Sequence, residues 1–439
     1  MHRITSVKKE RYFTMKRQQD ALPTGKTETL FRPWLSLVGM SESGWAGIAE
    51  EGRAAIAQAS ILVGSQRQLH HIPEQVGQRR MLWPSPIQAG IDEILKHQGQ
   101  QVCVLASGDP FWFGIGATLS RHLPHGAMRS LPGASAFSMA AARQAWPLQD
   151  CLCLSLVARD PENLRRAFAP GRRLLVLSEN GSSPARLAEL LCEAGFANSP
   201  LWAWQRMGGE AETCRQALAK DWRDTQVDAL NTVAVECVPS RVDAGMSRSA
   251  GRPEDDFIHD GQISKREVRA VILAYLAPKG GEHLWDLGGG SGAVSVEWLL
   301  ADQHNSATVV ERREDRCLNI QANAKRFGLP QLHCVQGDCG DVIAELAPPS
   351  AVFIGGGITS DGLLERCWQA LSVGGRIVAS AVTIEGEAAL ISACQHYGGN
   401  LSRIAVERSE ALGGFQSMTP QRSVTIWHTN KTLNEKERY

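Results

Sequence analysis

The sequence predicts an α/β protein of two domains, each built on a mainly parallel sheet. Three observations support this fold class. The chain has 439 residues, while one domain usually holds roughly 100–200. Short apolar runs that suit buried strands alternate with helical patterns along most of the chain. Residues 239–255, near the middle, are rich in Ser, Gly, Pro and charge without an apolar period, which is typical of a linker.

Composition excludes several classes of protein. Hydrophobic residues make up 43% and charged residues 21%, as in ordinary globular proteins. Lys and Arg total 46, as do Asp and Glu, so the basic excess of a nucleic-acid-binding protein is absent. No apolar run approaches the ~20 residues that span a bilayer, and no signal peptide is visible. The 11 cysteines show no CxxC spacing, which predicts free thiols, no metal site and a cytoplasmic location.

The first half divides into an extension and an α/β region. Residues 1–32 are rich in Lys and Arg and lack an apolar period, so we expect a disordered basic extension. After it, glycines and small polar residues end several of the apolar runs. We expect strands at 34–39, 61–64, 102–107 and 173–178, with helices at 48–59, 87–97, 114–122 and 183–194.

The second half begins with a helix over 264–277, because Ser264 and Glu267 have the spacing of a capping box. Two last apolar runs, near 400–408 and 421–428, have no helix between them and predict a terminal antiparallel hairpin. Further strands are expected at 283–287, 307–311, 332–336, 351–354 and 376–380. The expected domains are 33–238 and 256–429, with the linker 239–255 between them and a tail at 430–439.

A glycine-rich turn carries the sharpest chemical signal. Asp286 and the run Gly288–Gly292 stand where an expected strand ends and a helix opens. Glycines there let backbone amides approach a ligand, and Glu311, at the end of the next strand, can accept both hydroxyls of a ribose. The spacing up to Ala293 also fits a dinucleotide fingerprint. The terminal hairpin, and an acid two residues before the first glycine, favour S-adenosylmethionine.

Two further loops of the second half follow strands. Asp338 could meet an adenine or could simply cap the next helix. The run Gly355–Gly357 offers no stacking surface but leaves room for a bulky substrate against bare backbone. In the first half, Ser107–Asp109 and the loop before Ala136 also lie at strand ends, where open sheets bind ligands.

Longer motifs then resemble the precorrin-6Y C5,15-methyltransferase (decarboxylating) family of cobalamin biosynthesis. In the first half these are WPSPI at 83–87, LASGDP at 105–110, FGIGATL at 113–119 and LPGASAFSMAAAR at 131–143. In the second half they are SKREVRA at 264–270, LWDLGGGSG at 284–292, VSVEW at 294–298, FIGGG at 353–357, GGRIVASAVTIEGE at 374–387 and ALGGF at 411–415. The first half departs from the family at Ser41 and at Val157-Ala158.

The resemblance implies the fold and the reaction. An N-terminal tetrapyrrole methylase domain would methylate carbon 5. A C-terminal Rossmann-like S-adenosylmethionine-dependent methyltransferase domain, with its terminal antiparallel hairpin, would methylate carbon 15 and remove the carboxyl of the ring C acetate. Together they would convert precorrin-6Y to precorrin-8X. One S-adenosyl-L-methionine per domain, no metal and a homo-oligomer (dimer or tetramer) are expected, with neither nucleic acid nor membrane as a partner.

The resemblance and the loop positions together give a set of site residues. The cofactor residues are Ser264, Asp286, Gly288, Gly289, Gly290, Ser291, Gly292, Glu311, Asp338 and Cys339 in the second half, with Gly39, Ser107, Gly108, Asp109, Ser135 and Ala136 in the first. The substrate residues include the cations Lys265, Arg266, Arg269, Arg67 and Arg159, because the many carboxylates of such a substrate need cations. They also include Gly355, Gly356 and Gly357, which leave room for the substrate.

No catalytic acid, base or nucleophile is assigned, since methyl transfer from a sulphonium needs alignment more than a protein nucleophile. Trp112 and Trp285 lie beside these loops and could stack a planar ring, although core packing is the commoner role of tryptophan. Three alternatives are open at this point. They are another small-molecule methyltransferase, a nicotinamide-dependent oxidoreductase that uses the glycine turn, and a tetrapyrrole carrier without activity.

Overall fold

The computed structural model describes residues 33–223 and 227–432. The expected extension 1–32 lies outside these residues, as does the tail from 433 to 439. The chain divides into two compact units, one formed by the described residues up to 40 together with 48–133, the other by residues 41–47 and the described chain from 134 onward. Each is described by itself. The division expected at the linker 239–255 stays a prediction.

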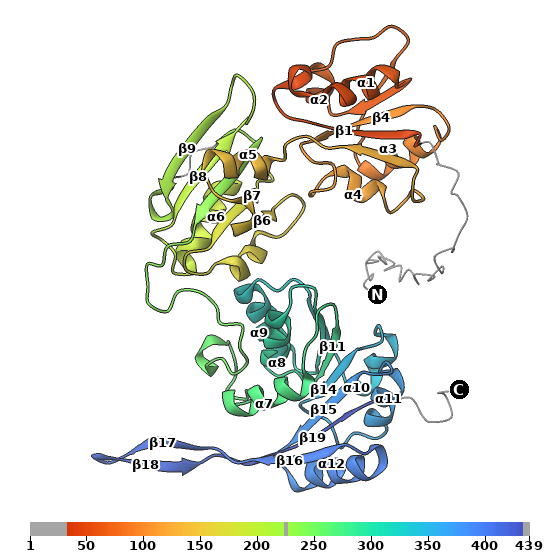
Figure 1. Ribbon diagram of the computed structural model, residues 1–439. Helices are drawn as coiled ribbons and strands as arrows, with labels where there is room; N and C mark the ends of the chain where they lie inside the picture. The colour runs from red at the N-terminus through yellow and green to blue at the C-terminus, as the bar shows by residue number, and fades with distance from the viewer. Residues whose placement is uncertain (1–32, 224–226, 433–439) are drawn as a thin grey trace, which may run out of the picture. The chain divides into compact units, whose positions relative to one another are not determined.

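The first unit holds a five-stranded parallel sheet (Figure 1). In sheet order its strands are β3 (Arg79–Leu82), β2 (Ile61–Gly64), β4 (Val102–Ser107), β1 (Leu35–Met40) and β5 (Met128–Leu131). Its helices are α1 (Glu50–Gln58), α2 (Gln66–His70), α3 (Ile87–Leu95) and α4 (Ile115–Leu119). The central strands β1, β2 and β4 are almost continuously buried, as expected for a parallel sheet.

The second unit begins with the short helix η1 (Gly44–Gly47) and continues into another five-stranded sheet, which is mixed. Its strands in order are β6 (Cys151–Ser155), β7 (Arg173–Leu177), β10 (Asn231–Glu236), β8 (Pro200–Gln205) and β9 (Thr213–Leu218). Only β6 and β7 pair in parallel, so the expectation of one mainly parallel sheet in the first half was wrong. The helices are α5 (Ala136–Arg143), α6 (Ser183–Glu193), η2 (Leu148–Asp150), η3 (Pro161–Ala167) and η4 (Ala219–Asp221).

The last part of the second unit is a seven-stranded sheet that carries the candidate site. Its strands in order are β13 (Leu332–Gln336), β12 (Ser306–Glu311), β11 (His283–Leu287), β14 (Ala351–Ile354), β15 (Arg376–Ala381), β19 (Val424–Asn430) and β16 (Asn400–Ile404). The first five strands are parallel, while β19 pairs antiparallel with β15 and β16. This is the Rossmann-like sheet with a terminal antiparallel pair that the sequence predicts.

Helices connect these strands. They are η5 (Glu254–Asp256), α7 (Arg266–Leu276), α8 (Ala293–Ala301), α9 (Glu314–Phe327), α10 (Cys339–Val342), η6 (Ile343–Glu345), α11 (Leu363–Ala370) and α12 (Ile384–Tyr397). Residues 293–300 of α8 are all buried, since this helix is apolar almost all round and lies in the core. Trp298 and Trp285 are also core residues, which excludes Trp285 as a stacking surface.

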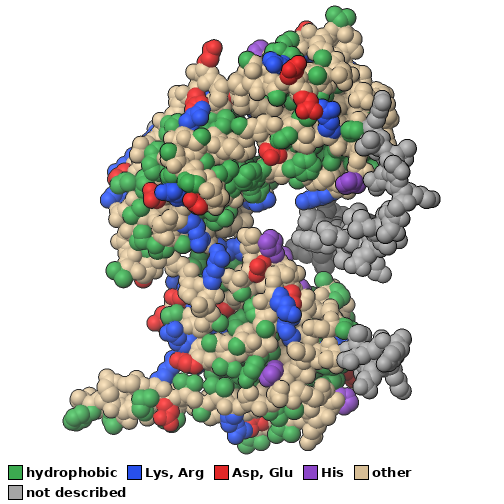
Figure 2. All heavy atoms as spheres, in the orientation of Figure 1, with side chains coloured by type: hydrophobic (Ala, Val, Ile, Leu, Met, Phe, Trp, Pro, Cys, Tyr) green, Lys and Arg blue, Asp and Glu red, His purple; other side chains and the backbone are tan. Residues whose placement is uncertain are grey.

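A two-stranded arm leaves the seven-stranded sheet between β16 and β19. It consists of β17 (Glu407–Leu412) and β18 (Phe415–Pro420), joined by a two-residue turn at Gly413 and Gly414. Figure 1 shows it extending beyond the sheet, and apolar side chains gather at its tip in Figure 2. Phe415, beside the turn, is 83% exposed. The sequence predicted the pairing of β16 with β19 but not the arm between them.

Candidate active site

The glycine turn after β11 needs glycine for two physical reasons. Gly288, Gly290 and Gly292 all have positive φ angles, of 72°, 59° and 73°. A Cβ on Gly288 would lie 2.8 Å from the backbone nitrogen of Gly356, so the turns after β11 and β14 touch through bare backbone. This close approach puts the two glycine runs that the sequence singled out beside each other. Gly292 then serves as the N-cap of α8.

Glu311, the last residue of β12, is tied to the glycine turn. Its Oε2 accepts a hydrogen bond from the amide of Gly290 at 2.9 Å, and its Oε1 accepts one from the amide of Arg313 at 3.0 Å. The residue is 6% exposed. Each carboxylate oxygen can accept a second hydrogen bond, so the two oxygens can also accept hydrogen bonds from the hydroxyls of a ribose.

Asp286 lies beneath the turn and is 1% exposed. Its Oδ2 accepts a hydrogen bond from the hydroxyl of Ser295 at 2.7 Å, while Oδ1 has no partner among the described residues. Burial raises the pKa of this carboxyl to about 7, against the lowering effect of the Ser295 hydrogen bonds. Because Asp286 does not line the cavity described below, it supports the turn from behind.

We expect Asp286→Asn to change how stability depends on pH. Because the folded protein raises the pKa of Asp286, protonation of this carboxyl favours the folded state. This stabilisation is fully present below the ordinary pKa of 3.8 and is lost as pH rises through about 7. Asparagine stays neutral, so the variant should gain stability over the wild type as pH rises, by at most about 4 kcal/mol. Urea unfolding at several pH values measures the difference. Parallel curves for the two proteins would contradict the assignment.

A cavity of about 790 Å³ opens at the carboxyl ends of the parallel strands. This edge is where open α/β sheets bind ligands. The cavity brings together most of the residues that the sequence predicted for the second half. They are Ser264, Lys265, Gly288, Gly289, Gly290, Ser291, Glu311, Asp338, Cys339, Gly355, Gly356 and Gly357.

Two of these residues have specific local roles. Asp338 is the N-cap of α10 and its Oδ1 accepts the amide proton of Gly340 at 2.9 Å, so the capping interpretation holds. It also lines the cavity, which leaves its second oxygen available to a ligand. Burial raises the pKa of the Cys339 thiol to about 11, so this cavity-lining group is a neutral thiol near pH 7.

The sequence missed two parts of the cavity lining. One belongs to strand β15, the arm's root and the start of β19, and consists of Ser380, Ala381, Val382, Val406, Gln421, Arg422 and Val424. The other consists of two arginines after β12, Arg312 and Arg316. The antiparallel strand β19 begins at the edge where β15 ends, with Thr425 opposite Ala381, so the expected hairpin already held the signal.

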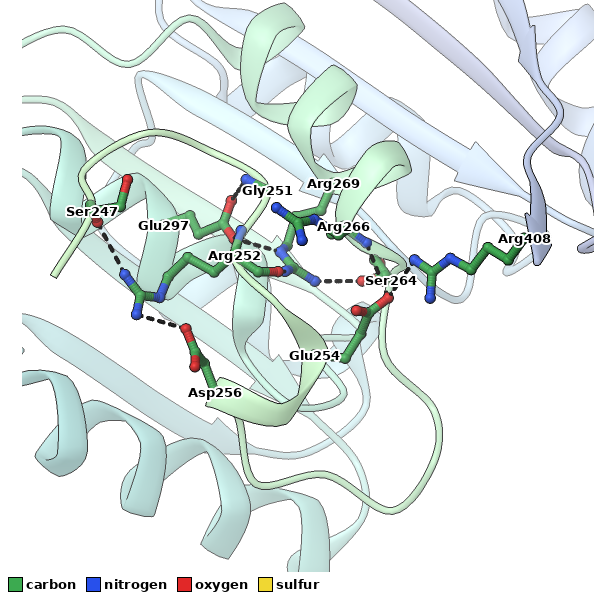
Figure 3. Close-up of polar contacts among 10 residues, drawn as sticks. All are labelled: Ser247, Gly251, Arg252, Glu254, Asp256, Ser264, Arg266, Arg269, Glu297 and Arg408. Carbon is green, nitrogen blue, oxygen red and sulfur yellow. Dashed lines mark hydrogen bonds and ion pairs between the residues drawn. The ribbon is translucent and has the colours of Figure 1, made fainter. Parts of the chain in front are cut away.

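Arg269 does not face the cavity, and its assignment to the substrate was wrong. Its side chain is 0% exposed and its Nε donates to Oε1 of Glu297, on α8, at 2.7 Å. Its two remaining nitrogens donate to the backbone oxygens of Ser264 and Arg252 (Figure 3). A guanidinium with all these partners, over the ring of Phe257, is a structural group.

The start of α7 also differs from the expected capping box. Lys265 is the N-cap and makes no side-chain capping bond, while the backbone oxygen of Ser264 accepts from Arg269. The amide of Arg266 is instead satisfied by Oε1 of Glu254 at 3.2 Å. The side chain of Arg266 is exposed and does not line the cavity, so of these two neighbouring cations only Lys265 lines it.

The network in Figure 3 fixes the segment before α7. The two oxygens of Glu297 accept the amides of Gly251 and Arg252, at 2.8 and 2.9 Å. Arg408, at the root of the arm, donates to Glu254 at 2.9 Å and to Glu267 at 2.6 Å. Part of the segment expected to be a linker is therefore bonded to the domain that follows it.

The predicted residues of the first unit gather at the end of its parallel sheet. A Cβ on Gly39 would lie 1.8 Å from the backbone oxygen of Gly108, so these two strand-end loops are in close backbone contact. Asp109 Oδ1 accepts the amide proton of Phe111 at 2.8 Å, which orders the loop. Arg67 donates to the hydroxyl of Ser107 at 3.3 Å. Trp112 nearby is 38% exposed and is not a core residue.

The remaining first-half residues belong to the second unit. Ser135 is the N-cap of α5, and its hydroxyl accepts the amide proton of Ser138 at 3.0 Å. Ala136 opens that helix. Arg159 is exposed and follows Ala158, whose φ angle is 53°. Within residues 33–223 and 227–432, no cluster of His, Cys, Asp and Glu could hold a metal, and no helix is long and apolar enough to cross a membrane.

Comparisons with known proteins agree on one family. The family described as tetrapyrrole (corrin/porphyrin) methylases matches residues 35–222, and the precorrin methyltransferase domain matches residues 255–431. A solved structure, the C-terminal domain of precorrin-6Y C5,15-methyltransferase from Rhodobacter capsulatus, is 47% identical. It covers 42% of this chain and all of that one, with a TM-score of 0.41.

Other relatives match nearly the whole chain. The precorrin-6Y C(5,15)-methyltransferase (decarboxylating) of a Sinorhizobium species is 40% identical over 91% of this chain and 97% of its own. The protein of that name from Mycobacterium tuberculosis strain CDC 1551 is 39% identical over 90% of this chain and 99% of its own. The chain therefore belongs to the precorrin-6Y C5,15-methyltransferase (decarboxylating) family.

Proposed function

We propose that this protein methylates precorrin-6Y at carbons 5 and 15 and removes the carboxyl of the ring C acetate, giving precorrin-8X in cobalamin biosynthesis. The observation that carries the proposal is the 40% identity to the Sinorhizobium enzyme over 97% of that protein's length. The cavity beside Gly290 and Glu311 supports it, because its donors and acceptors suit a nucleoside at one end and leave room beyond it.

S-adenosyl-L-methionine is the proposed methyl donor, with one site per domain. In the C-terminal domain the ribose would bind Glu311, and the adenine would lie near Asp338 and Cys339. In the N-terminal domain Gly39, Ser107–Asp109, Ser135 and Ala136 are the proposed residues. The sulphonium supplies a methyl group that is already activated, so the proposal assigns no metal to the reaction.

The chain's own contribution to the chemistry is alignment. The backbone turns at Gly288 and Gly356, which touch each other and line the cavity, leave a bare surface on which an acceptor carbon can approach the donor in line. A carbon of the electron-rich macrocycle is the nucleophile that accepts the methyl group. When the acetate loses carbon dioxide, the electron pair of the broken carbon–carbon bond passes into the conjugated ring. We therefore assign to these residues the positioning of the two reactants and the exclusion of water.

The direct test is to incubate the full chain with precorrin-6Y and S-adenosylmethionine and to weigh the product by mass spectrometry. Two added methyl groups and one lost carbon dioxide support the proposal. Methylation without decarboxylation, or reduction in the presence of a nicotinamide cofactor alone, would overturn it.

Asp109→Ala should separate the two methylations. The variant loses the hydrogen bond that Oδ1 accepts from the Phe111 amide, so the proposed cofactor loop of the N-terminal domain loosens. A hydrogen bond to a charged group contributes about 1.5–3 kcal/mol, so methylation at carbon 5 should slow about tenfold or more. The decarboxylating methylation should keep its rate. Product masses over time measure both steps, and equal slowing of both would show that the domains act as one.

A further inference from the structure

The cavity of the C-terminal domain runs along the sheet edge well past the proposed nucleoside. Glu311 ends β12, while Val424 begins β19, and both line the cavity. Between β12 and β19 the sheet order passes through β11, β14 and β15, which makes four strand spacings or about 19 Å. The cavity thus has a nucleoside end at β12 and β13 and a second end at β15 and β19.

Charge is divided unevenly between these two ends. The charged residues of the lining are Lys265, Glu311, Arg312, Arg316, Asp338 and Arg422. Glu311 ends β12 and Asp338 follows β13, so both acids lie at the nucleoside end. Arg316 is tied to Asp260 at 2.9 Å. Lys265 and Arg422 form no ion pair or side-chain hydrogen bond with any described residue, and the lining near Arg422 holds no acid.

The segment between β18 and β19, which carries Arg422, is fixed at the cavity by its neighbours. Gln421 and Val406 are the residues where the arm leaves the sheet, and the amide of Gln421 donates to the oxygen of Val406 at 2.8 Å. Both line the cavity. Arg408, which lies in β17 two residues after Val406, binds Glu254 (Figure 3) and also Glu267 in the first turn of α7. The arm's root and the start of α7 are therefore fastened together at the cavity.

We propose that Arg422 and Lys265 bind side-chain carboxylates of the tetrapyrrole acceptor and hold its ring at the Gly355–Gly357 backbone. Arg422 offers a planar fork that can take one carboxylate through two hydrogen bonds, and Lys265 offers a point charge. This inference rests on the proposed function, since it names the acceptor's contacts in the same site. It adds the arm's root as the wall that selects an acidic macrocycle.

The test is binding of uroporphyrin, a stable tetrapyrrole with only acetate and propionate side chains, to the full chain, followed by fluorescence. Arg422→Ala should weaken uroporphyrin binding about tenfold and should reduce the dependence of binding on salt. Arg422→Lys should recover part of the loss. Arg312→Ala is the matched control, because it removes the same charge from the nucleoside end of the same cavity and should leave uroporphyrin binding unchanged. Calorimetry should give the same affinity of Arg422→Ala and wild type for S-adenosylmethionine.

Equal weakening of uroporphyrin binding by Arg422→Ala and Arg312→Ala would overturn the inference. The affinity would then depend only on the net charge of the protein and not on the position of Arg422. The inference would also be overturned if wild type is active and Arg422→Ala binds uroporphyrin and converts precorrin-6Y as well as wild type does. Failure of the proposed function has a different signature. In that case wild type does not convert precorrin-6Y, while the difference between Arg422→Ala and Arg312→Ala in uroporphyrin binding persists.

Discussion

Glu311→Ala should abolish S-adenosylmethionine binding in the C-terminal domain at ordinary concentrations. The variant loses the acceptor for the ribose hydroxyls and also frees the amides of Gly290 and Arg313, which Glu311 holds at 2.9 and 3.0 Å. Two hydrogen bonds to a charged group contribute about 3–6 kcal/mol together, which is a loss of affinity of about 100-fold or more. Calorimetric titration of the full chain should show one fewer site per chain.

Glu314→Ala is the control for this experiment. It removes an exposed carboxylate from the first turn of α9, three residues after Glu311, and should leave the titration unchanged. Unchanged affinity and stoichiometry in Glu311→Ala would place the nucleoside elsewhere. Loss of both sites would mean that the two domains bind cofactor cooperatively.

Glu297→Ala should strongly destabilise the C-terminal domain. Glu297 and Arg269 form an ion pair whose side chains are 2% and 0% exposed, so the variant leaves a buried guanidinium without its counter-charge. Breaking such a pair costs about 3–5 kcal/mol, because the remaining charge is not solvated. The amides of Gly251 and Arg252 lose their acceptor as well. Thermal unfolding should show a clear fall in the midpoint of this domain.

The exposed ion pair of Arg403 and Glu387 provides the comparison. Its side chains are 61% and 28% exposed, and surface pairs contribute about 0–1 kcal/mol. Arg403→Ala should therefore leave the unfolding midpoint nearly unchanged. An equally small effect of Glu297→Ala would mean that water reaches Arg269 and that the segment before α7 is not fixed by this pair.

The parallel strands and the glycine turn were predictable because their signals are local. A buried run, glycines and an apolar helix follow one another within β11, the turn and α8, and the structure has them at the expected residues. The pairing of β8, β9 and β10 was not predictable in this way, since alternation along the chain does not tell which strands become neighbours. The mixed sheet of the first half was missed for that reason.

Partners distant in sequence explain the errors in the site. The local sequence does not distinguish Arg269 from the surface cations beside it. Its acceptor Glu297 lies 28 residues away, and the ion pair between them allows Arg269 to be buried. The capping box at Ser264 failed because Glu254, 12 residues before Arg266, satisfies the helix amide instead. The arm did have a local signal, since a Gly-Gly pair between Leu412 and Phe415 is typical of a two-residue hairpin turn.

Assembly of the chain into a dimer or tetramer stays a prediction.

On this account one chain carries out two methyl transfers and one decarboxylation on each substrate molecule. The most direct measurement is the stoichiometry of the wild-type reaction, with label in the methyl group of S-adenosylmethionine and in the ring C acetate carboxyl of precorrin-6Y. We predict two labelled methyl groups in the product for each labelled carbon dioxide released. A single methyl per carbon dioxide, or methyl transfer while the carboxyl label stays in the product, would contradict the account.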